Sequence, residues 1–291
     1  MLRADCHCHS TYSDGAHSAE TLIEMAAAHE LTGLSITDHD TIEAYLSGLH
    51  LNTPSNLQLL AGVELSTQYE RTPVHVLGYS FDIQNAQLQS LCTEQQQNKL
   101  NRNLLILDKL RKLDMDISYE ALQARFEPQR NIGRPHIAQY LFEQKFVSST
   151  AEAFKKYLGN TSRCFVKGEF ISTEEAINVI QNAGGYAVIA HPHMMKKPKV
   201  MRALLTLPFD GIEAYYGKLP KERHSPWIRA AEKNNWFTTG GSDYHGIEGE
   251  YKYLGSSLTP ASIFEKLVQR FKQNNRIITS QPHPLSSAPL E

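Results

Sequence analysis

The sequence is poor in cysteine, has no long apolar run and carries almost no excess charge. Only four cysteines occur in 291 residues, too few and too scattered for a disulfide framework. No apolar run approaches the roughly 20 residues that span a bilayer. The opening residues, MLRADCHCHS, contain no apolar signal-peptide region. We therefore expect a cytoplasmic protein that does not associate with a membrane.

The near balance of charge limits the kind of partner. The chain has 29 Lys and Arg against 31 Asp and Glu, a formal net charge of -2. A stable complex with long nucleic acid needs many cationic contacts to phosphates, so we do not expect one. A small phosphorylated nucleotide or a short oligoribonucleotide fits better, because a metal cluster can supply positive charge locally. The sequence does not indicate the oligomeric state.

Strands and helices alternate in the first and last parts of the chain. Short apolar runs predict strands at Leu2–Cys8, Leu34–Thr37, Leu57–Leu65, Val74–Tyr79, Tyr186–Ala190, Gly211–Tyr215 and Trp236–Gly240. Helices are predicted at Ala19–His29, Thr41–Leu49, Thr173–Asn182, Val200–Leu207, Lys221–Asn234 and Pro260–Lys272. This alternation favours an α/β fold with parallel strands.

The middle of the chain differs, because strand signals nearly vanish there. A long helix is predicted at Leu91–Leu113, with an apolar stripe formed by Leu100, Leu104, Leu107 and Leu110. Further helices are predicted at Tyr119–Phe126, Pro135–Gln144 and Thr150–Leu158. We therefore expect one α/β domain in two parts, residues 1–84 and 164–280, interrupted by a helical insertion at 85–163. Residues 281–291, rich in Pro and Ser, should form a flexible tail.

Two histidines stand at the end of the first predicted strand. Side chains alternate along a strand, so His7 and His9 point to one face and Cys6 and Cys8 to the other. Two imidazoles spaced in this way can bind one metal ion. They could equally be two solvent-facing histidines. Thiolate ligation by the two cysteines is a weaker alternative, because no second cysteine pair completes a structural zinc site.

Further histidines and carboxylates recur at the ends of predicted strands. Asp38, His39 and Asp40 directly follow one strand, although Asp40 could instead cap the next helix. Glu64 ends an apolar run, where a buried carboxylate requires a cation nearby. The other candidates at loops and strands are Asp14, His75, His191, Asp243 and His245. Each of these signals alone has a structural explanation, but their repetition indicates a shared site.

Taken together, these motifs resemble the polymerase and histidinol phosphatase (PHP) superfamily. The resemblance rests on His7-x-His9, Ser13-Asp14-Gly15, Thr37-Asp38-His39-Asp40, Gly62-Val63-Glu64-Leu65-Ser66, His75, His191-Pro192 and Gly241-Ser242-Asp243-Tyr244-His245, in the order of the family. Within it, the chain looks like the branch of nucleoside 3′,5′-bisphosphate phosphatases and RNase AM-type exoribonucleases. That branch is supported by Gly133-Arg134-Pro135-His136, Gly211-Ile212-Glu213-Ala214-Tyr215 and His75-Val76-Leu77-Gly78-Tyr79. Cys6 stands where the family usually has Leu, and should serve as a small core residue.

The resemblance implies a fold and a metal site. The fold would be a distorted (β/α)7 barrel related to the TIM barrel, with two or three divalent metal ions at the carboxyl ends of its strands. Manganese is the first expectation, with iron or zinc as alternatives, since every ligand is a nitrogen or oxygen. The implied ligand sets are His7, His9, Glu64 and Asp243 for the first ion, Glu64, His75 and His191 for the second, and Asp14, His39 and His245 for the third.

The resemblance also implies an activity. A metal-bound hydroxide would remove the 3′-phosphate of a nucleoside 3′,5′-bisphosphate, converting pAp to AMP and phosphate. The alternatives are 5′-to-3′ exonuclease activity on short 5′-phosphorylated RNA, histidinol phosphate phosphatase activity and a non-catalytic metal-binding module. Arg134 and His136 would act as catalytic and substrate-binding residues that hold a substrate phosphate. They could instead be an ordinary helix start, with Pro135 at its favoured first position.

Overall fold

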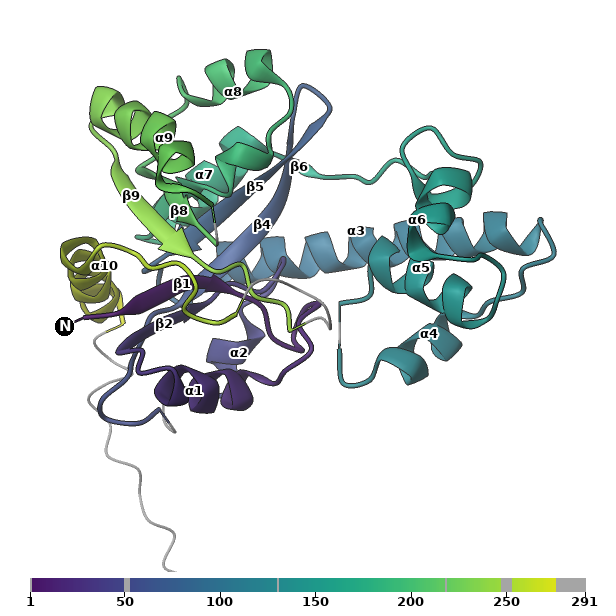
Figure 1. Cartoon of the computed structure of the whole chain (residues 1–291), viewed down its shortest axis with the longest axis horizontal. Coiled ribbons are helices and arrows are strands. Elements are labelled where there is room, and N and C mark those ends of the chain that lie inside the picture. The colour runs from purple at the N-terminus through teal and green to yellow at the C-terminus, as the bar shows by residue number, and fades with distance from the viewer. Residues whose placement is uncertain (1, 50–52, 130, 218, 247–252, 276–291) are drawn as a thin grey trace, which may run out of the picture.

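The structure, a computed structural model, describes residues 2–49, 53–129, 131–217, 219–246 and 253–275 (Figure 1). The predicted tail at 281–291 lies outside the described residues. Strands and helices build a body from which the long helix α3 leads out to a lobe made of α4, α5 and α6 (Figure 1). The α/β prediction is confirmed. In the described ranges, no helix has both the length and the apolar composition to cross a membrane.

The strands of the body form two sheets. A three-stranded parallel sheet has the order β1 (Ala4–Cys8), β2 (Gly33–Ile36), β3 (Gln58–Leu59). The other sheet has the order β6 (Ile171–Ser172), β4 (Gly62–Tyr69), β5 (Thr72–Tyr79), β7 (Tyr186–Ile189), β8 (Gly211–Tyr216), β9 (Phe237–Gly241). Isolated parallel bridges join the sheets, Cys8 to Tyr244 and His39 to Glu64. Because the strands are divided between two sheets joined by isolated bridges, the strand pairing does not establish a closed barrel, which stays a prediction.

The expectation of parallel strands is wrong for β5, which runs antiparallel to both β4 and β7. Glu70 and Arg71 connect β4 to β5 and have φ values of 44° and 62°. Positive φ at both central residues is what a type I′ hairpin turn requires. Asn and Gly, the residues that usually indicate this turn, do not occur here, so the hairpin could not be predicted from its turn residues.

The predicted strand Leu57–Leu65 is two strands. The backbone N–H of Leu60 donates to Leu34 O in the first sheet, whereas the carbonyl of Ala61 accepts from Ser80 N beside the second. The chain therefore passes from one sheet to the other between these two residues. This crossing places the strand that carries Glu64 beside the loop after β2.

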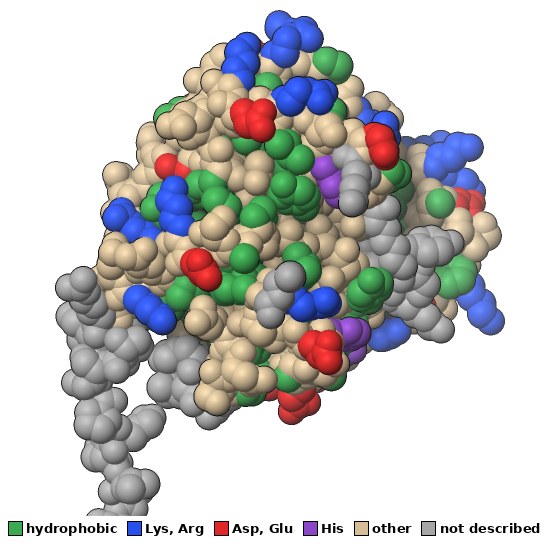
Figure 2. All heavy atoms as spheres, turned by 60° about the vertical axis from the view of Figure 1, so that its left-hand side comes forward, with side chains coloured by type: hydrophobic (Ala, Val, Ile, Leu, Met, Phe, Trp, Pro, Cys, Tyr) green, Lys and Arg blue, Asp and Glu red, His purple; other side chains and the backbone are tan. Residues whose placement is uncertain are grey.

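Helices cover the two sheets. They are α1 (Ala19–Ala28), α2 (Glu43–Leu46), α7 (Thr173–Asn182), α8 (Pro198–Leu204), α9 (Lys221–Asn234) and α10 (Ala261–Asn274). The Ser18 and Ser172 hydroxyls cap α1 and α7. The helix predicted at Thr41–Leu49 is limited to the short α2. On the face shown in Figure 2, cationic and acidic side chains are interspersed, as the small net charge suggests.

The lobe consists of the outer part of α3 (Ala86–Arg111) with α4 (Tyr119–Phe126), α5 (Arg134–Glu143) and α6 (Thr150–Ala153), which continues into a π-helical turn at Phe154–Leu158. Its buried apolar cluster draws only on residues between Ile106 and Cys164. The predicted apolar stripe on α3 is partly wrong, because Leu104 is 45% exposed while Asn103 is buried. Asn103 turns inward because its amide donates a 2.7 Å hydrogen bond to Ile132 O. The domain boundaries proposed above stay a prediction.

Candidate metal centre

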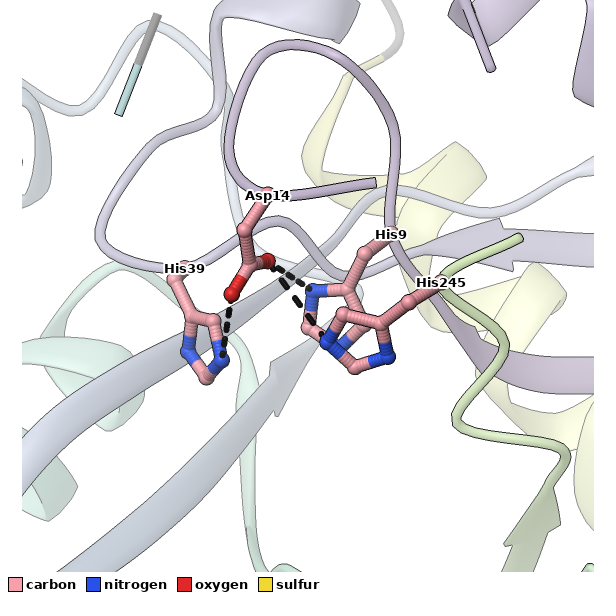
Figure 3. A group of neighbouring side chains, drawn as sticks. All are labelled: His9, Asp14, His39 and His245. Atoms are coloured by element: carbon pink, nitrogen blue, oxygen red, sulfur yellow. Dashed lines mark ion pairs between the residues drawn. The ribbon is translucent and has the colours of Figure 1, made fainter. Parts of the chain in front are cut away.

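The nine side chains expected to bind metal come from both sheets and meet near the bridges that join the sheets. β1 supplies His7 and leads directly to His9, while β4 and β5 supply Glu64 and His75. The remaining five follow strands or lie in loops: Asp14, His39, His191, Asp243 and His245. Figure 3 shows Asp14 directed toward the rings of His9, His39 and His245. The donor atoms of all of these residues except His191 form three overlapping groups.

The first group contains His7, His9, Glu64 and Asp243. His9 Nε2 lies 3.2 Å from Glu64 Oε2 and 3.2 Å from Asp243 Oδ1. His7 Nε2 lies 3.2 Å and 3.3 Å from the same two oxygens. Ligands bound at about 2.1 Å to one ion lie roughly 3.0–3.4 Å apart. The spacing of this buried group therefore suits a divalent cation.

Glu64 connects the first group to the second, which contains His39, Glu64 and His75. Its Oε1 lies 2.8 Å from His75 Nδ1 and 2.9 Å from His191 Nε2. Its Oε2, which faces the first group, is also 3.4 Å from His39 Nδ1. One carboxylate thus faces imidazoles on both sides, as a ligand shared by two ions would.

The third group surrounds Asp14 (Figure 3). Its Oδ1 lies 3.8 Å from His9 Nδ1 and 3.6 Å from His245 Nε2, and its Oδ2 lies 4.0 Å from His39 Nε2. His9 therefore borders two groups, although the resemblance implied it for the first alone. The structure thus brings together the first expected set, and the third with His9 added, whereas the group at Glu64 contains His39 and His75 in place of His75 and His191.

Ring nitrogens that lie near carboxylates but make no well-directed hydrogen bond support a metal at this place. Both ring nitrogens of His9 and Nδ1 of His39 are buried without a hydrogen-bond partner. A buried polar atom left unsatisfied costs about 1–3 kcal/mol, which a bound cation would remove. The donors are imidazole nitrogens and carboxylate oxygens, a set that suits manganese, iron or zinc. The residues present therefore fit divalent metal ions.

The pKa shifts divide the expected ligands into two kinds. Burial would raise the pKa of Glu64, but the nearby His39, His7 and His75 outweigh it and hold that pKa well below its usual range. Burial lowers the pKa of His39 to about 4, against the opposing pull of Glu64 and Asp14. The carboxylate is thus ionised and this imidazole neutral, the forms that bind metal. Burial would lower the pKa values of His7 and His9, but the neighbouring carboxylates outweigh it and raise them, that of His9 to about 10, so a metal ion would have to displace their protons.

Comparison with known proteins identifies the family. The PHP domain model matches residues 5–188, well over half of the chain. The chain belongs to the PHP family.

Relatives in the PHP family share the phosphoester chemistry. A 5′-3′ exoribonuclease of Haemophilus influenzae is 32% identical over 246 residues, which cover 83% of this chain and 89% of the relative. A 3′,5′-nucleoside bisphosphate phosphatase of Chromobacterium violaceum is 27% identical over 250 residues, covering 84% and 88%. A crystal structure from Bifidobacterium adolescentis, described as a metal-dependent phosphoesterase, superposes with a TM-score of 0.78 at 28% identity and covers 92% of this chain and 96% of that one. The protein is a metal-dependent phosphoesterase, a hydrolase of phosphate esters.

A buried carboxylate outside the nine holds two of the histidines in this PHP chain. Glu213 Oε1 lies 2.9 Å from His7 Nδ1, and its Oε2 accepts a 2.7 Å hydrogen bond from the backbone N–H of His191. Such a partner fixes the orientation of a ligand ring and strengthens its donor nitrogen. Sequence reasoning used Glu213 only within the motif Gly211–Tyr215 and left its role open, although an acid inside the apolar strand β8 was a signal of the same kind as Glu64.

Other polar side chains hold the surrounding loops. Tyr216 donates a 2.6 Å hydrogen bond to Asp243 Oδ2. Asp38 accepts from the hydroxyls of Ser10 and Ser13 at 2.6 and 2.5 Å, which fixes the loop leading to Asp14. His191 and Asp243 have positive φ values of 26° and 52°, a strained conformation typical of functional sites.

Asp40 does not cap α2, because that helix has Ile42 at its N-cap without a side-chain hydrogen bond. The Asp40 carboxylate instead accepts from Ser66 N and Oγ, at 2.7 and 2.8 Å, and pairs with Lys99 at 3.3 Å. It therefore ties the loop after β2 to β4 and α3.

The thiols of Cys6 and Cys8 lie away from the ligand groups. Both cysteines are fully buried in apolar clusters of the core. The three groups of donor atoms found in the described part of the chain contain neither cysteine. Their environment therefore favours packing over metal ligation.

Arg134 and His136 lie in different surroundings at the start of α5. Arg134 lines a cavity of about 280 Å³ that also reaches Asp14, His39 and His75. Its Nη1 donates to Leu158 O at 3.1 Å and Asn160 Oδ1 at 3.2 Å. The guanidinium is therefore held at the wall of a cavity continuous with the ligand groups.

His136 is buried behind this cavity, and both of its ring nitrogens have partners. Gly133 N–H donates to Nδ1 at 3.0 Å, so Nε2 carries the proton and donates to Gln129 Oε1 at 2.9 Å. The Gln129 amide in turn donates to Gly15 O at 2.9 Å. His136 is therefore connected to the Asp14 loop rather than to the cavity.

Proposed function

We propose that this enzyme hydrolyses the phosphoester at the 3′-oxygen of a 5′-phosphorylated nucleotide. A nucleoside 3′,5′-bisphosphate is the smallest such substrate, and pAp would yield AMP and phosphate. The observation that carries this proposal is the continuity between the ligand groups and a cationic cavity, whose lining includes Lys99, Arg102 and Arg134. Its volume of about 280 Å³ lies at the lower end of ligand sites, which suits a single nucleotide.

The side chains have distinct parts in this reaction. Divalent ions held by the nine ligands would supply positive charge to the phosphate oxygens and an activated water. The Glu64 carboxylate lies between the imidazoles of His7 and His75 and holds both in place, and Tyr216 fixes the rotamer of Asp243. Arg134 binds phosphate oxygens from the cavity side. These contacts hold the phosphorus and the attacking water in a fixed geometry, which lowers the entropic part of the barrier.

A 5′-to-3′ exoribonuclease is the second candidate, because the same bond would break. Cleavage between phosphorus and O3′ releases AMP from pAp, and it releases the first nucleotide from 5′-phosphorylated RNA. The two substrates differ at the reacting phosphorus. In the bisphosphate it belongs to a terminal phosphate, whereas in RNA it is also bonded to the next nucleotide of the strand. A second cavity of about 310 Å³, lined by His75, His191 and Met194, offers room beside the ligand groups for that continuation. The 32% identity to a protein named 5′-3′ exoribonuclease adds support.

The remaining candidates fit less well. Histidinol phosphate has one phosphate and an amine, whereas the cavity is rich in cations. A non-catalytic module would not need nine assembled donor residues beside a substrate-sized cavity. The cavity therefore favours a substrate that carries more than one phosphate.

The test is phosphate release from adenosine 3′,5′-bisphosphate with added manganese, compared with AMP release from a short 5′-phosphorylated oligoribonucleotide. Asp243→Asn, which alters an expected ligand, is the control and should abolish both reactions. Release of phosphate from the first substrate alone would support the phosphatase, and release of AMP from both would support the broader activity. No turnover of either substrate by metal-loaded enzyme would refute the proposal.

A further inference from the structure

The lining of the cationic cavity contains a second arginine with no assigned role. Arg102 lies on α3 and is half-buried, and its Nε is buried without a hydrogen-bond partner. Its guanidinium carbon lies 5.8 Å from the centre of the Phe170 ring. On another side Arg102 lies close to the backbone of Gly168. A Cβ added to that glycine would lie 3.3 Å from Arg102 Nη1. The side chain is thus held in place without having its charge neutralised.

Arg102 and Arg134 are close enough for their charges to interact. Burial, reinforced by the charge of Arg134, lowers the pKa of Arg102 to about 10, so the guanidinium stays charged at neutral pH. In the described part of the chain neither arginine forms an ion pair, and Asp14 is the only acidic residue lining the cavity. Asp40, which also lies near α3, is already bound by Lys99 and Ser66. Two half-buried guanidinium groups without an acid between them form an anion site.

This anion site and the ligand groups lie in the same cavity, whose lining runs from Asp14, His39 and His75 to Arg102 and Arg134. A nucleoside 3′,5′-bisphosphate has two phosphates separated by a ribose. If one phosphate reacts beside the histidines, the other extends along the cavity. Phe165 and Phe170 also line it and offer aromatic faces to a base.

We propose that Arg102, together with Arg134, binds the phosphate that is not hydrolysed, and thereby makes the enzyme selective for substrates with a 5′-phosphate. The inference rests on the proposed function, which it makes more specific. Arg71 and Lys167, which are exposed where they line the same cavity, would attract the anion without fixing its orientation. Lys99 keeps its partner Asp40 and stabilises the wall.

The experiment compares kcat/KM for adenosine 3′,5′-bisphosphate with that for adenosine 3′-monophosphate, which lacks the 5′-phosphate. The wild type should prefer the bisphosphate, and Arg102→Gln should reduce that preference roughly tenfold to hundredfold, the range expected for hydrogen bonds to a charged group. Arg102→Lys, which keeps the charge but loses the bidentate geometry, should give an intermediate preference. Arg202→Gln, which removes an exposed cation on α8, is the matched control and should keep the wild-type ratio.

The outcomes separate this inference from the proposed function. If the wild type turns over neither the bisphosphate nor 5′-phosphorylated RNA, the proposed function fails. If it turns over the bisphosphate but Arg102→Gln keeps the full preference, Arg102 does not bind the second phosphate, and only this inference fails. The melting temperature of Arg102→Gln should stay near that of the wild type, because Arg102 Nε has no hydrogen bond to lose and the main contact removed is that with the Phe170 ring. If that variant unfolds, Arg102→Lys decides by the same ratio.

Discussion

Gly241 lies so close to His7 that a Cβ on this glycine would come within 2.3 Å of the His7 Cβ and 2.5 Å of its backbone nitrogen. This contact is where the end of β9 meets β1, so a side chain would push the two strands apart. We expect Gly241→Ala to destabilise the protein by about 1–3 kcal/mol or more and to weaken metal binding. Urea denaturation would measure the loss.

Gly133→Ala is a matched control for that variant. A Cβ at Gly133 would have its nearest neighbour, Pro135 Cδ, at 3.5 Å, an ordinary van der Waals distance. The urea midpoint of this variant should stay near that of the wild type. A Gly241→Ala protein as stable as Gly133→Ala would show that the two strands can separate without cost.

Removal of Glu213 should weaken metal binding without removing a ligand. In Glu213→Ala, His7 Nδ1 and the His191 backbone N–H lose their buried acceptor. Loss of such a partner typically costs tenfold to hundredfold in metal affinity. Titration against a chelator would measure the change. Glu232→Gln, on the exposed side of α9, should bind metal like the wild type; equal affinities for all three proteins would contradict the role given to Glu213.

Metal binding should stabilise the fold, because the buried His9 and His39 nitrogens gain partners. With manganese at a hundred times its dissociation constant, one site would add about 2.7 kcal/mol to the free energy of unfolding. Thermal denaturation of chelator-treated and manganese-loaded protein would show the shift, and elemental analysis would count the ions. A single tight ion with no rise in melting temperature would argue against a cluster of two or three.

Arg134→Ala should mainly raise KM for the bisphosphate. The guanidinium lies at the cavity wall, where it can bind a phosphate before and during the reaction. Steady-state kinetics with manganese would separate KM from kcat. An unchanged KM would exclude Arg134 from phosphate binding.

His136→Leu should behave differently, because His136 reaches the Asp14 loop through Gln129. We expect a fall in kcat and in metal occupancy, with a smaller change in KM than Arg134→Ala produces. Gln129→Ala, which removes the next member of the same chain of hydrogen bonds, should reproduce this pattern. If His136→Leu raised KM alone, the histidine would have to contact the substrate directly.

Much of the fold followed from local patterns. Strands β1, β2, β7, β8 and β9 and the long helix α3 lie where short apolar runs and helical spacing indicated. The hairpin did not, because Glu70 and Arg71 adopt positive φ without Gly or Asn to announce it. The buried face of α3 was misjudged at Leu104, because burial of Asn103 through a hydrogen bond to Ile132 O cannot be seen in an apolar pattern.

The metal centre, like the fold, was predicted in part. The nine histidines and carboxylates that the family resemblance implied are assembled, because strand ends from both sheets converge. Glu213, whose role the sequence left open, and Arg102, which it did not single out, were not predicted as site residues for different reasons. Glu213 is a single acid within a strand, and its partners His7 and His191 are distant in sequence. Arg102 lies on a helix where a cation is ordinarily solvated, and only the folded cavity reveals it beside Arg134.

The backbone hydrogen bond between Asp243 and His7 bears on the order in which the enzyme folds. Glu64 and His75 meet within one hairpin, but Asp243 N donates to His7 O across 236 positions of sequence, a contact that requires nearly the whole polypeptide. A nascent chain emerging from the ribosome therefore carries only a fragment of the ligand set until β9 is synthesised. Capture of the complete metal cluster would thus mark the end of folding rather than its start.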